Sequence, residues 1–146
     1  LIDYRIACNP ERIYADFKGY SKLNQKLITP LSALPIDIQR ILNKENVLDF
    51  GIINDGINFQ PSQHKVHMTS NLVFQYALGI LISGKVNNVY LAGFDGYPNG
   101  DPRNDESKQI IEDYYYNKNA IELKSITPTC YDIKEESVFF KLNDEN

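Results

Sequence analysis

Apolar residues recur along the chain in short runs, separated by polar segments rich in glycine, proline and asparagine. Short runs with β-branched or aromatic residues predict strands over residues 3–8, 26–29, 46–53 and 120–126. A further apolar run over residues 88–92 stops at Gly93, and a polar Gly/Asp/Pro segment follows it. We therefore expect a buried strand there that leads directly into a loop.

Apolar residues at helical spacing fill the stretches between these strands. They predict helices over residues 11–20, 35–43, 69–83 and 106–117. In the first of these, Ile13 and Phe17 are expected to face inward, with Tyr14 as a further candidate; in the last, Ile110, Ile111 and Tyr114 are. Asn9 and Pro10 suit the N-cap and the first position of the first helix. The helix over residues 69–83 is apolar nearly all round, so we expect it to be buried, with Gly84 just after its end.

Strands that alternate with helices predict an α/β fold. We expect a Rossmann-like, mainly parallel sheet with helices on both faces, in one domain over residues 1–146. The chain starts without Met and almost directly in a strand-like run. We therefore expect a C-terminal piece of a longer protein, with a sheet that is incomplete at its N-terminus. Val138, Phe139 and Phe140 in the acidic tail are expected to form an edge strand or to cover the core.

Composition excludes several classes of partner. The 146 residues suit one core, and the net charge of −4 with no basic stripe disfavours nucleic acid. No apolar run approaches the roughly 18 residues of a membrane span. Cys8 and Cys130 are too few for a disulfide scaffold, so we expect buried thiols and a reducing, cytoplasmic location.

Residues 54–68 are polar and turn-rich, and they predict a long loop that contains both histidines. His64 and His67 have the spacing H-x-x-H, but only weak additional ligands such as Asp55 lie near them in the sequence. A role in surface or loop packing is expected, and either histidine could instead act as a general base. We assign no metal and no cofactor.

Two polar segments are candidates for ligand binding. Thr69, Ser70 and Asn71 open the expected buried helix, and one of them would cap it whatever the function. The sharper interpretation is an anion site at the helix N-terminus. Asp95 and Tyr97 follow a core strand, where ligands bind in α/β proteins. The same loop matches a calcium-binding loop poorly, because Tyr97 takes a ligand position and a strand leads in.

The segments around these sites resemble a known family. Residues 67–71, 77–79 and 88–100 are similar to the core of the bacterial sialyltransferases of lipooligosaccharide synthesis. Those enzymes have a Thr-Ser-Gly helix start, a buried helix, and a strand that ends in Gly-Ile-Asp-Phe-Tyr-x-Asn-Gly. Cys8-Asn9 also resembles their Cys-Asn, and residues 125–129 lie where they have a Cys-Pro-Asn-Ser segment. The similarity keeps one order over most of the chain, and its central block is the specific part.

This resemblance implies a nucleotide-sugar site. In the family, the matching Asn and the Thr/Ser pair contact the nucleotide-sugar, and the Tyr after the Asp helps the phosphate to leave. With the polar neighbours of those positions, the candidates are catalytic Tyr97 and Asp95 and ligand-binding Asn9, Thr69, Ser70, Asn71 and Asn99.

Three departures from the family argue against catalysis by this chain alone. The family's first strand and Gly-Asn-Gly loop would precede Leu1. Its catalytic His has no counterpart in residues 98–106, and its second helper Tyr is also absent there. The run over residues 92–97 resembles a further group as well. There a sialyltransferase-like Rossmann domain follows an aldolase-type barrel of the HMG-CoA lyase/oxovalerate-aldolase family in surface-polysaccharide proteins.

We therefore expect a bacterial sialyltransferase-like domain that binds a nucleotide-sugar, lacks transferase activity by itself, and partners an N-terminal aldolase-type domain of the same chain. One alternative is an active glycosyltransferase with a CMP-sugar donor and a base such as His64 or His67. The other is a structural module that forms a homo-oligomer through Tyr114, Tyr115 and Tyr116.

Overall fold

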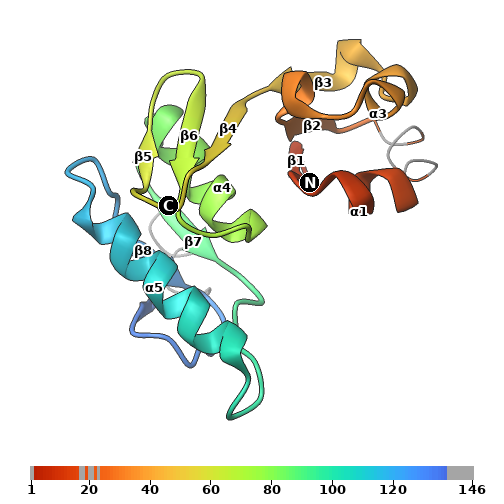
Figure 1. Cartoon of the computed structure of the whole chain (residues 1–146). Helices are drawn as coiled ribbons and strands as arrows, with labels where there is room; N and C mark the ends of the chain where they lie inside the picture. Colours follow the sequence, from red (N-terminus) through yellow and green to blue (C-terminus); the bar gives the residue numbers. More distant parts are fainter. Residues whose placement is uncertain (1, 17–18, 20–21, 23, 138–146) are drawn as a thin grey trace, which may run out of the picture. The chain divides into compact units, whose positions relative to one another are not determined.

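The computed structural model describes residues 2–16, 19, 22 and 24–137. The chain divides into two compact units, Leu1–Gly84 and Lys85–Asn146, and each unit is described by itself. Both units combine short strands with helices (Figure 1), which confirms the predicted mixed α/β class. Five of the six strand pairings in the described residues are parallel, as predicted. A single domain over residues 1–146 stays a prediction.

The first unit begins with a parallel sheet of three strands in the order β1-β2-β3. These strands are β1 (Tyr4–Ile6), β2 (Lys26–Thr29) and β3 (Val47–Asp49). Within the described residues, the helices between them are α1 (Pro10–Ala15) and α3 (Ile36–Ile41), with short 3-10 turns at Leu31–Ala33 and Lys44–Asn46.

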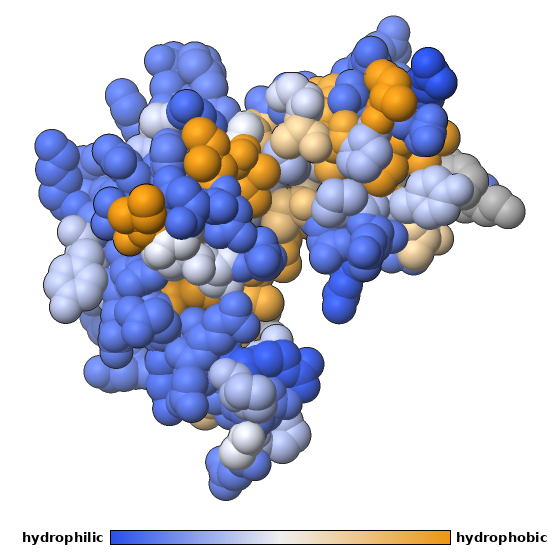
Figure 2. All heavy atoms as spheres, viewed as in Figure 1, coloured by the Kyte–Doolittle hydropathy of each residue, from blue (hydrophilic) through white to orange (hydrophobic). Residues whose placement is uncertain are grey.

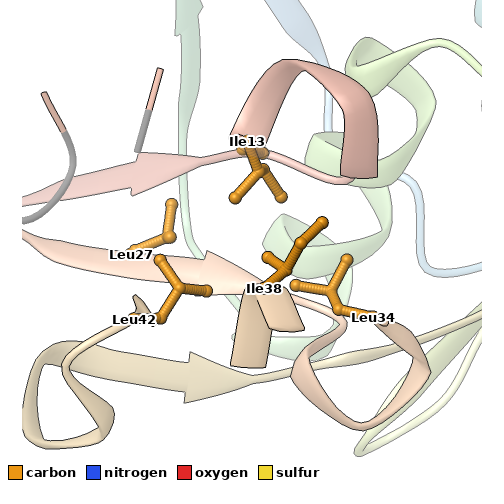
Figure 3. Packing of buried hydrophobic residues seen from close by; sticks show 6 residues of the cluster. Ile13, Leu27, Leu34, Ile38 and Leu42 are labelled. Carbon is orange, nitrogen blue, oxygen red and sulfur yellow. The ribbon is translucent and has the colours of Figure 1, made fainter. Parts of the chain in front are cut away.

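A compact apolar core holds this sheet and the helices α1 and α3 together. Ile13 of α1, Leu27 of β2 and Ile38 of α3 are each at most 5% exposed. Figure 3 shows these side chains pointing toward one another, together with Leu34 and Leu42. Burial of this apolar area is the main stabilising term for the short helices, which are too short to be stable alone.

The start of α1 is as predicted. The side-chain oxygen of Asn9 accepts a hydrogen bond from the backbone N–H of Arg12 at 3.0 Å, and Pro10 occupies the first turn. Tyr14, considered as an inward-facing residue, is 60% exposed. The other expected core residue of this helix, Phe17, lies outside the described residues.

The prediction of one strand over residues 46–53 is wrong. The stretch forms β3 and then β4 (Gly51–Asn54), which belongs to a second sheet. The backbone N–H of Phe50 donates to Thr29 O, and the next N–H, of Gly51, donates to His64 O. The chain therefore changes its pairing partner at Phe50, whose buried side chain anchors the change.

The prediction of a loop over residues 54–68 is also wrong in part. It contains β5 (Gln60–Pro61) and β6 (Lys65–Met68), which pair antiparallel, while β4 pairs parallel with β6. Burial alternates along β6: Val66 and Met68 are fully buried, and Lys65 and His67 are not. A half-buried strand has this period of two. The alternation is difficult to recognise in the sequence, because the residues around it are polar.

The second sheet is covered by α4 (Val73–Ser83), which begins four residues later than predicted. A Cβ atom on Gly79 would lie 2.8 Å from Cγ2 of Val66, so the helix backbone comes very close to β6. Gly84 is the C-cap residue with a right-handed backbone conformation, and Lys85 takes the left-handed one, at φ 52°.

The second unit contains a parallel sheet in the order β7-β8-β9. Its strands are β7 (Val89–Leu91), β8 (Leu123–Ser125) and β9 (Lys134–Glu135), and its helix is α5 (Pro102–Tyr116). The predicted inward residues of that helix, Ile110, Ile111 and Tyr114, are buried. The helix starts earlier than expected because Asp101 caps it, with Pro102 in its first turn.

The remaining expectations concern the surface and the termini. On the face seen in Figure 2, hydrophilic residues predominate and apolar ones form smaller patches. No helix in the described part of the chain is both long and apolar enough to cross a membrane. Both cysteines are free, but Cys8 is only half-buried and Cys130 is exposed, so the expected burial of both thiols is wrong. The expected edge strand over residues 138–140 lies outside the described residues.

The Gly79–Val66 contact leads to a test of stability. Gly79→Ala should destabilise the protein by about 1–2 kcal/mol, because the clash outweighs a helix-propensity gain of about 1 kcal/mol. Val66 is 0% exposed, and its Cβ, Cγ1 and Cγ2 atoms all lie within 3.2 Å of the new methyl group. A change of the Val66 rotamer therefore cannot relieve the clash. Urea unfolding of the single variants and the Gly79→Ala/Val66→Ala double variant measures the coupling. A Gly79→Ala protein more stable than the wild type would contradict the expectation.

Candidate functional site

The carboxyl ends of β4 and β6 bring together six polar side chains of the first unit. Parallel pairing places Asn54 opposite Met68, so the residues that follow both strands lie at one edge. We call the following residues the β4–β6 edge cluster: Asn54, Asp55, His67, Thr69, Ser70 and Asn71. Ligands of α/β proteins bind at such edges.

Asp55 and His67 are the two ionisable residues of the cluster, and their side chains are in contact. His67 Nδ1 lies 2.7 Å from Asp55 Oδ2, and the two side chains are 31% and 30% exposed. The other carboxylate oxygen, Oδ1, accepts the backbone N–H of Ile57 at 3.1 Å. The hydrogen bond to His67, followed by that from Ile57, holds the pKa of Asp55 below its usual value. Asp55 is therefore a fixed carboxylate that orients the imidazole ring.

A second contact closes the same edge. The side-chain amide of Asn54 donates to the amide oxygen of Asn71. The backbone N–H of Gly56 donates to Met68 O at 3.2 Å, which holds the turn after β4 against the end of β6. Both asparagine side chains are exposed, so the edge presents amide groups to solvent.

Thr69 and Ser70 do not open the helix as predicted. The N-cap of α4 is Leu72, which has no side-chain cap, and Ser70 Oγ accepts the backbone N–H of Leu72 at 3.0 Å. The backbone N–H groups of Thr69 and Ser70 both donate to Oε1 of Gln75, at 3.0 and 2.9 Å. The donors expected to meet an anion are thus engaged by a side chain of the helix itself.

Gln75 is the residue of this site that sequence reasoning missed. It is 0% exposed, and its Nε2 donates to Thr69 Oγ1 at 2.7 Å. A glutamine on the buried side of an otherwise apolar helix needs hydrogen-bond partners. A glutamine at this position therefore indicates, from the sequence alone, that polar groups pack against α4.

In the second unit, the loop over residues 93–101, called here the Tyr97 loop, is held by Asn104 of α5. Asn104 Oδ1 accepts the backbone N–H of Tyr97 at 2.9 Å, and Nδ2 donates to Tyr97 O at 3.0 Å. Nδ2 also contacts Pro98 O, and the hydroxyl of Tyr131 donates to Oδ1. One half-buried amide therefore sets the backbone around Tyr97.

Asp95 is tied to the segment after β8. Its Oδ1 accepts from Thr127 Oγ1 at 3.3 Å, and that hydroxyl oxygen accepts the N–H of Gly93 at 2.9 Å. The carbonyl of Asp95 also accepts the N–H of Cys130. These contacts fix Asp95 at the carboxyl end of β7, as predicted from the Gly/Asp break.

Arg103 and Asp101 flank Tyr97. The guanidinium of Arg103 lies over the Tyr97 ring, 4.1 Å from its centre, in a cation–π contact. The same guanidinium donates to both carboxylate oxygens of Asp101, at 2.9 and 2.5 Å. These hydrogen bonds lower the pKa of Asp101 to about 2 and raise the pKa of Arg103. The Tyr97 ring is thus covered on one face by a paired cation, and the residue stays 37% exposed.

Gly96 allows this loop to lie directly on Cys130. Gly96 has φ 105°, and a Cβ atom there would lie 2.1 Å from Cys130 Sγ. Only glycine fits this backbone position. Cys130 and Tyr131 also line a groove of about 570 Å³ along α5, whose other lining residues are Lys108, Ile111, Glu112, Tyr115, Tyr116 and Asp132.

Of the three tyrosines suggested as a face for a homo-oligomer, one is buried. Tyr114 is 0% exposed, and its hydroxyl exchanges hydrogen bonds with the backbone of Ile121. The hydroxyl of Tyr115 accepts the N–H of Leu123 at 3.1 Å. Tyr115 is nevertheless 44% exposed and Tyr116 is 88% exposed, so these two tyrosines form the open face, while Tyr114 serves the packing of α5 on β8.

The structure therefore places the candidates in three separate surroundings. Thr69, Ser70 and Asn71 join one cluster, Asp95, Tyr97 and Asn99 lie in the Tyr97 loop, and Asn9 caps α1. The β4–β6 edge cluster and the Tyr97 loop belong to different units, so binding of one ligand by both stays a prediction. His64 is exposed in the turn before β6.

Known proteins give no further assignment for this site. Protein-family models, curated proteins and solved structures were all compared with the chain, and none matches. Within the described residues, no three side chains of His, Cys, Asp and Glu gather in a way that could hold a metal ion.

The paired carboxylate at the start of α5 gives a pH test. Because the folded pKa of Asp101, about 2, lies below its ordinary 3.8, its ionised form contributes stability that is lost as the pH falls from about 4 to about 2. We expect the difference in Tm between the wild type and Asp101→Asn to shrink over that range. Asp101→Ala should lower the Tm further than Asp101→Asn, by an amount that depends little on pH, because alanine also removes the side-chain cap of α5. A wild-type advantage as large at pH 2 as at pH 5 would refute the assignment.

The hydrogen bonds of Gln75 give a second test. Gln75→Leu should lower the free energy of unfolding by about 1–3 kcal/mol, because it leaves the N–H groups of Thr69 and Ser70 without their acceptor. Gln39→Leu, which removes one half-buried bond to Leu34 O, is the matched control and should cost less. Urea unfolding compares the two variants, and equal losses would mean that Gln75 does not organise the turn.

Proposed function

We propose that this chain is a sialyltransferase-like domain that binds a nucleotide-sugar. The fold we propose with it is Rossmann-like, and the setting is a bacterial protein of surface-carbohydrate biosynthesis with an aldolase-type domain in the same chain. Binding does not require catalysis, and the segment between Asp95 and α5 holds no histidine that could serve as the family's base.

One observation carries the proposal: the parallel pairing of β4 with β6 gathers the polar residues of both strand ends at one edge. That edge holds two exposed asparagine amides and the hydroxyl groups of Thr69 and Ser70. Phosphate and sugar hydroxyls are bound by just these donor and acceptor types. The edge also lies immediately before α4, an 11-residue helix whose dipole favours an anion there.

At this edge, side chains and not backbone N–H groups are the proposed ligand contacts. Since Gln75 occupies the N–H groups of Thr69 and Ser70, the side chains of Ser70 and Asn71 are the groups we propose for the ligand. Asn54, which holds Asn71, orients the amide. Asn9 and Asn99 stay proposed contacts from the resemblance alone.

For the second unit we propose that Tyr97 stabilises a departing phosphate and that Asp95 positions its loop. The cation–π contact supports this role, because Arg103 places positive charge beside the phenol ring. A phenol and a nearby guanidinium both stabilise charge that develops on a leaving group.

The test is binding of CMP-sialic acid, with CMP and a UDP-sugar for comparison. A ligand at about one hundred times its Kd stabilises the folded protein by about 2.7 kcal/mol, which is a rise of several degrees in Tm. Ser70→Ala and Asn71→Ala should each weaken binding about tenfold or more, as for a lost hydrogen bond to a charged group. Isothermal titration measures these affinities.

Ser83→Ala is the matched control, because it makes the same change at the other end of α4, where the hydroxyl donates to Ser62 O and Gly79 O. Its affinity for CMP-sialic acid should equal that of the wild type. If none of the nucleotides raises the Tm of the wild type, the binding proposal fails and a structural module remains.

A further inference from the structure

We propose that His67, oriented by Asp55, is a catalytic base that removes the proton from a hydroxyl acceptor of the transferred sugar. This inference rests on the proposed nucleotide-sugar site and adds a reaction to it. It differs from the expectation of an inactive domain, because the base comes from β6 and not from the Tyr97 loop.

The geometry sets the tautomer of the ring. Asp55 Oδ2 is an acceptor, and His67 Nδ1 lies 2.7 Å from it, so Nδ1 carries the proton of the neutral ring. The other nitrogen, Nε2, is then the basic one. A carboxylate that fixes an imidazole in this way is the arrangement by which histidine bases are oriented in unrelated enzymes.

The carboxylate is itself held in place. The N–H of Ile57 donates to Asp55 Oδ1, so the turn after β4 orients the oxygen that faces His67. Parallel pairing of Ile53 with His67 fixes the height of the ring along the edge. A surface ion pair of two long flexible side chains would lack this double constraint.

The charged surroundings of His67 are simple. β4, β5 and α4 contain no acidic or basic residue, and the buried Tyr76 of α4 donates its hydroxyl to Phe50 O. Lys65, two residues earlier on β6, lies on the same side of the strand as His67. Asp55 and Lys65 are therefore the charged groups on the described elements around the ring, and only Asp55 bonds to it.

The position of the pair suits a reaction at the proposed ligand. His67 is the last but one residue of β6, and Ser70 and Asn71 follow within four residues. The two side chains are about one third exposed, which leaves the ring open to a bound acceptor. Base and proposed ligand contacts thus share one edge.

The step balances without an oxidant, reductant or metal. His67 Nε2 takes the proton of the acceptor hydroxyl as that oxygen forms a bond to the anomeric carbon of the sugar. The bond from this carbon to the phosphate oxygen breaks, and its electron pair leaves with the nucleoside monophosphate. With water as acceptor, the same step is hydrolysis.

The experiment measures release of CMP from CMP-sialic acid, with lactose or water as acceptor, alongside the affinity for the donor. We expect His67→Gln to bind the donor within about twofold of the wild type and to release CMP about 100-fold more slowly or worse, the usual contribution of a general base. His64→Gln is the matched control and should release CMP at the wild-type rate.

Two further variants separate catalysis from structure. Added imidazole should restore CMP release to His67→Ala, since a missing base can be supplied from solution and a missing structural contact cannot. Asp55→Asn should slow release with donor affinity unchanged, because the carboxylate that holds the imidazole ring in its orientation and tautomer is lost.

Each outcome decides between the two proposals. Donor binding without CMP release, or equal release by His67→Gln and the wild type, overturns the catalytic role and leaves the binding site standing. No donor binding by the wild type overturns the proposed function, and the catalytic role with it. His67-dependent release that imidazole restores supports both.

Discussion

The parallel pairing of β4 with β6 is the interaction on which the proposed site depends. It places Asn54 opposite Met68 and thereby sets Asp55 beside His67 and Asn54 beside Asn71. A slip of the pairing by one residue would turn His67 into the core and Val66 outward. The buried Val66 and Met68 prevent that slip, so core packing also specifies the polar edge.

Side-chain amides stabilise the backbone of both candidate regions. Gln75 binds the turn before α4, and Asn104 binds the loop that follows β7. Asn104 uses both its donor and its acceptor on the backbone of Tyr97, whereas Gln75 accepts from two backbone N–H groups and donates to the hydroxyl of Thr69. A loop without regular secondary structure needs such partners when it is packed against a helix. The polar loops are therefore ordered by the same helices whose apolar faces form the cores.

Much of the fold could be predicted from the sequence where one local signal acted alone. Asn9 with Pro10 marked the start of α1, and residues 26–29 matched β2 because an apolar run ended at proline. The change of sheet at Phe50 could not be predicted, because the run over residues 46–53 is apolar on both sides of it and only long-range pairing divides it. The sequence predicts a loop in place of β5 and β6, because their exposed positions carry the same residue types as turns. The predicted start of α4 is wrong because its N-cap, Leu72, has no side chain that can cap a helix. The predicted start of α5 is wrong because the prediction overlooks the capping residue Asp101.

The segments that carry the candidate residues could be predicted from the sequence, but the contacts between their side chains could not. The polar residues after β6 and β7 were identified, and Asp55 was noted beside the histidines, but the contact between Asp55 and His67 required the register of two strands. The roles of Gln75 and Asn104 depend on where a helix places a side chain against a distant turn, which periodicity does not reveal.

The close contact between Gly79 and Val66 also has a consequence for divergence of this sequence. No space separates the two residues. A lineage that replaces the glycine with a larger residue must therefore carry a smaller residue in place of the valine, acquired either beforehand or at the same time. The two positions should therefore vary together among descendants of this protein, although they lie on different elements. Such paired change would identify the α4–β6 layer in relatives too divergent for their helices and strands to be aligned with confidence.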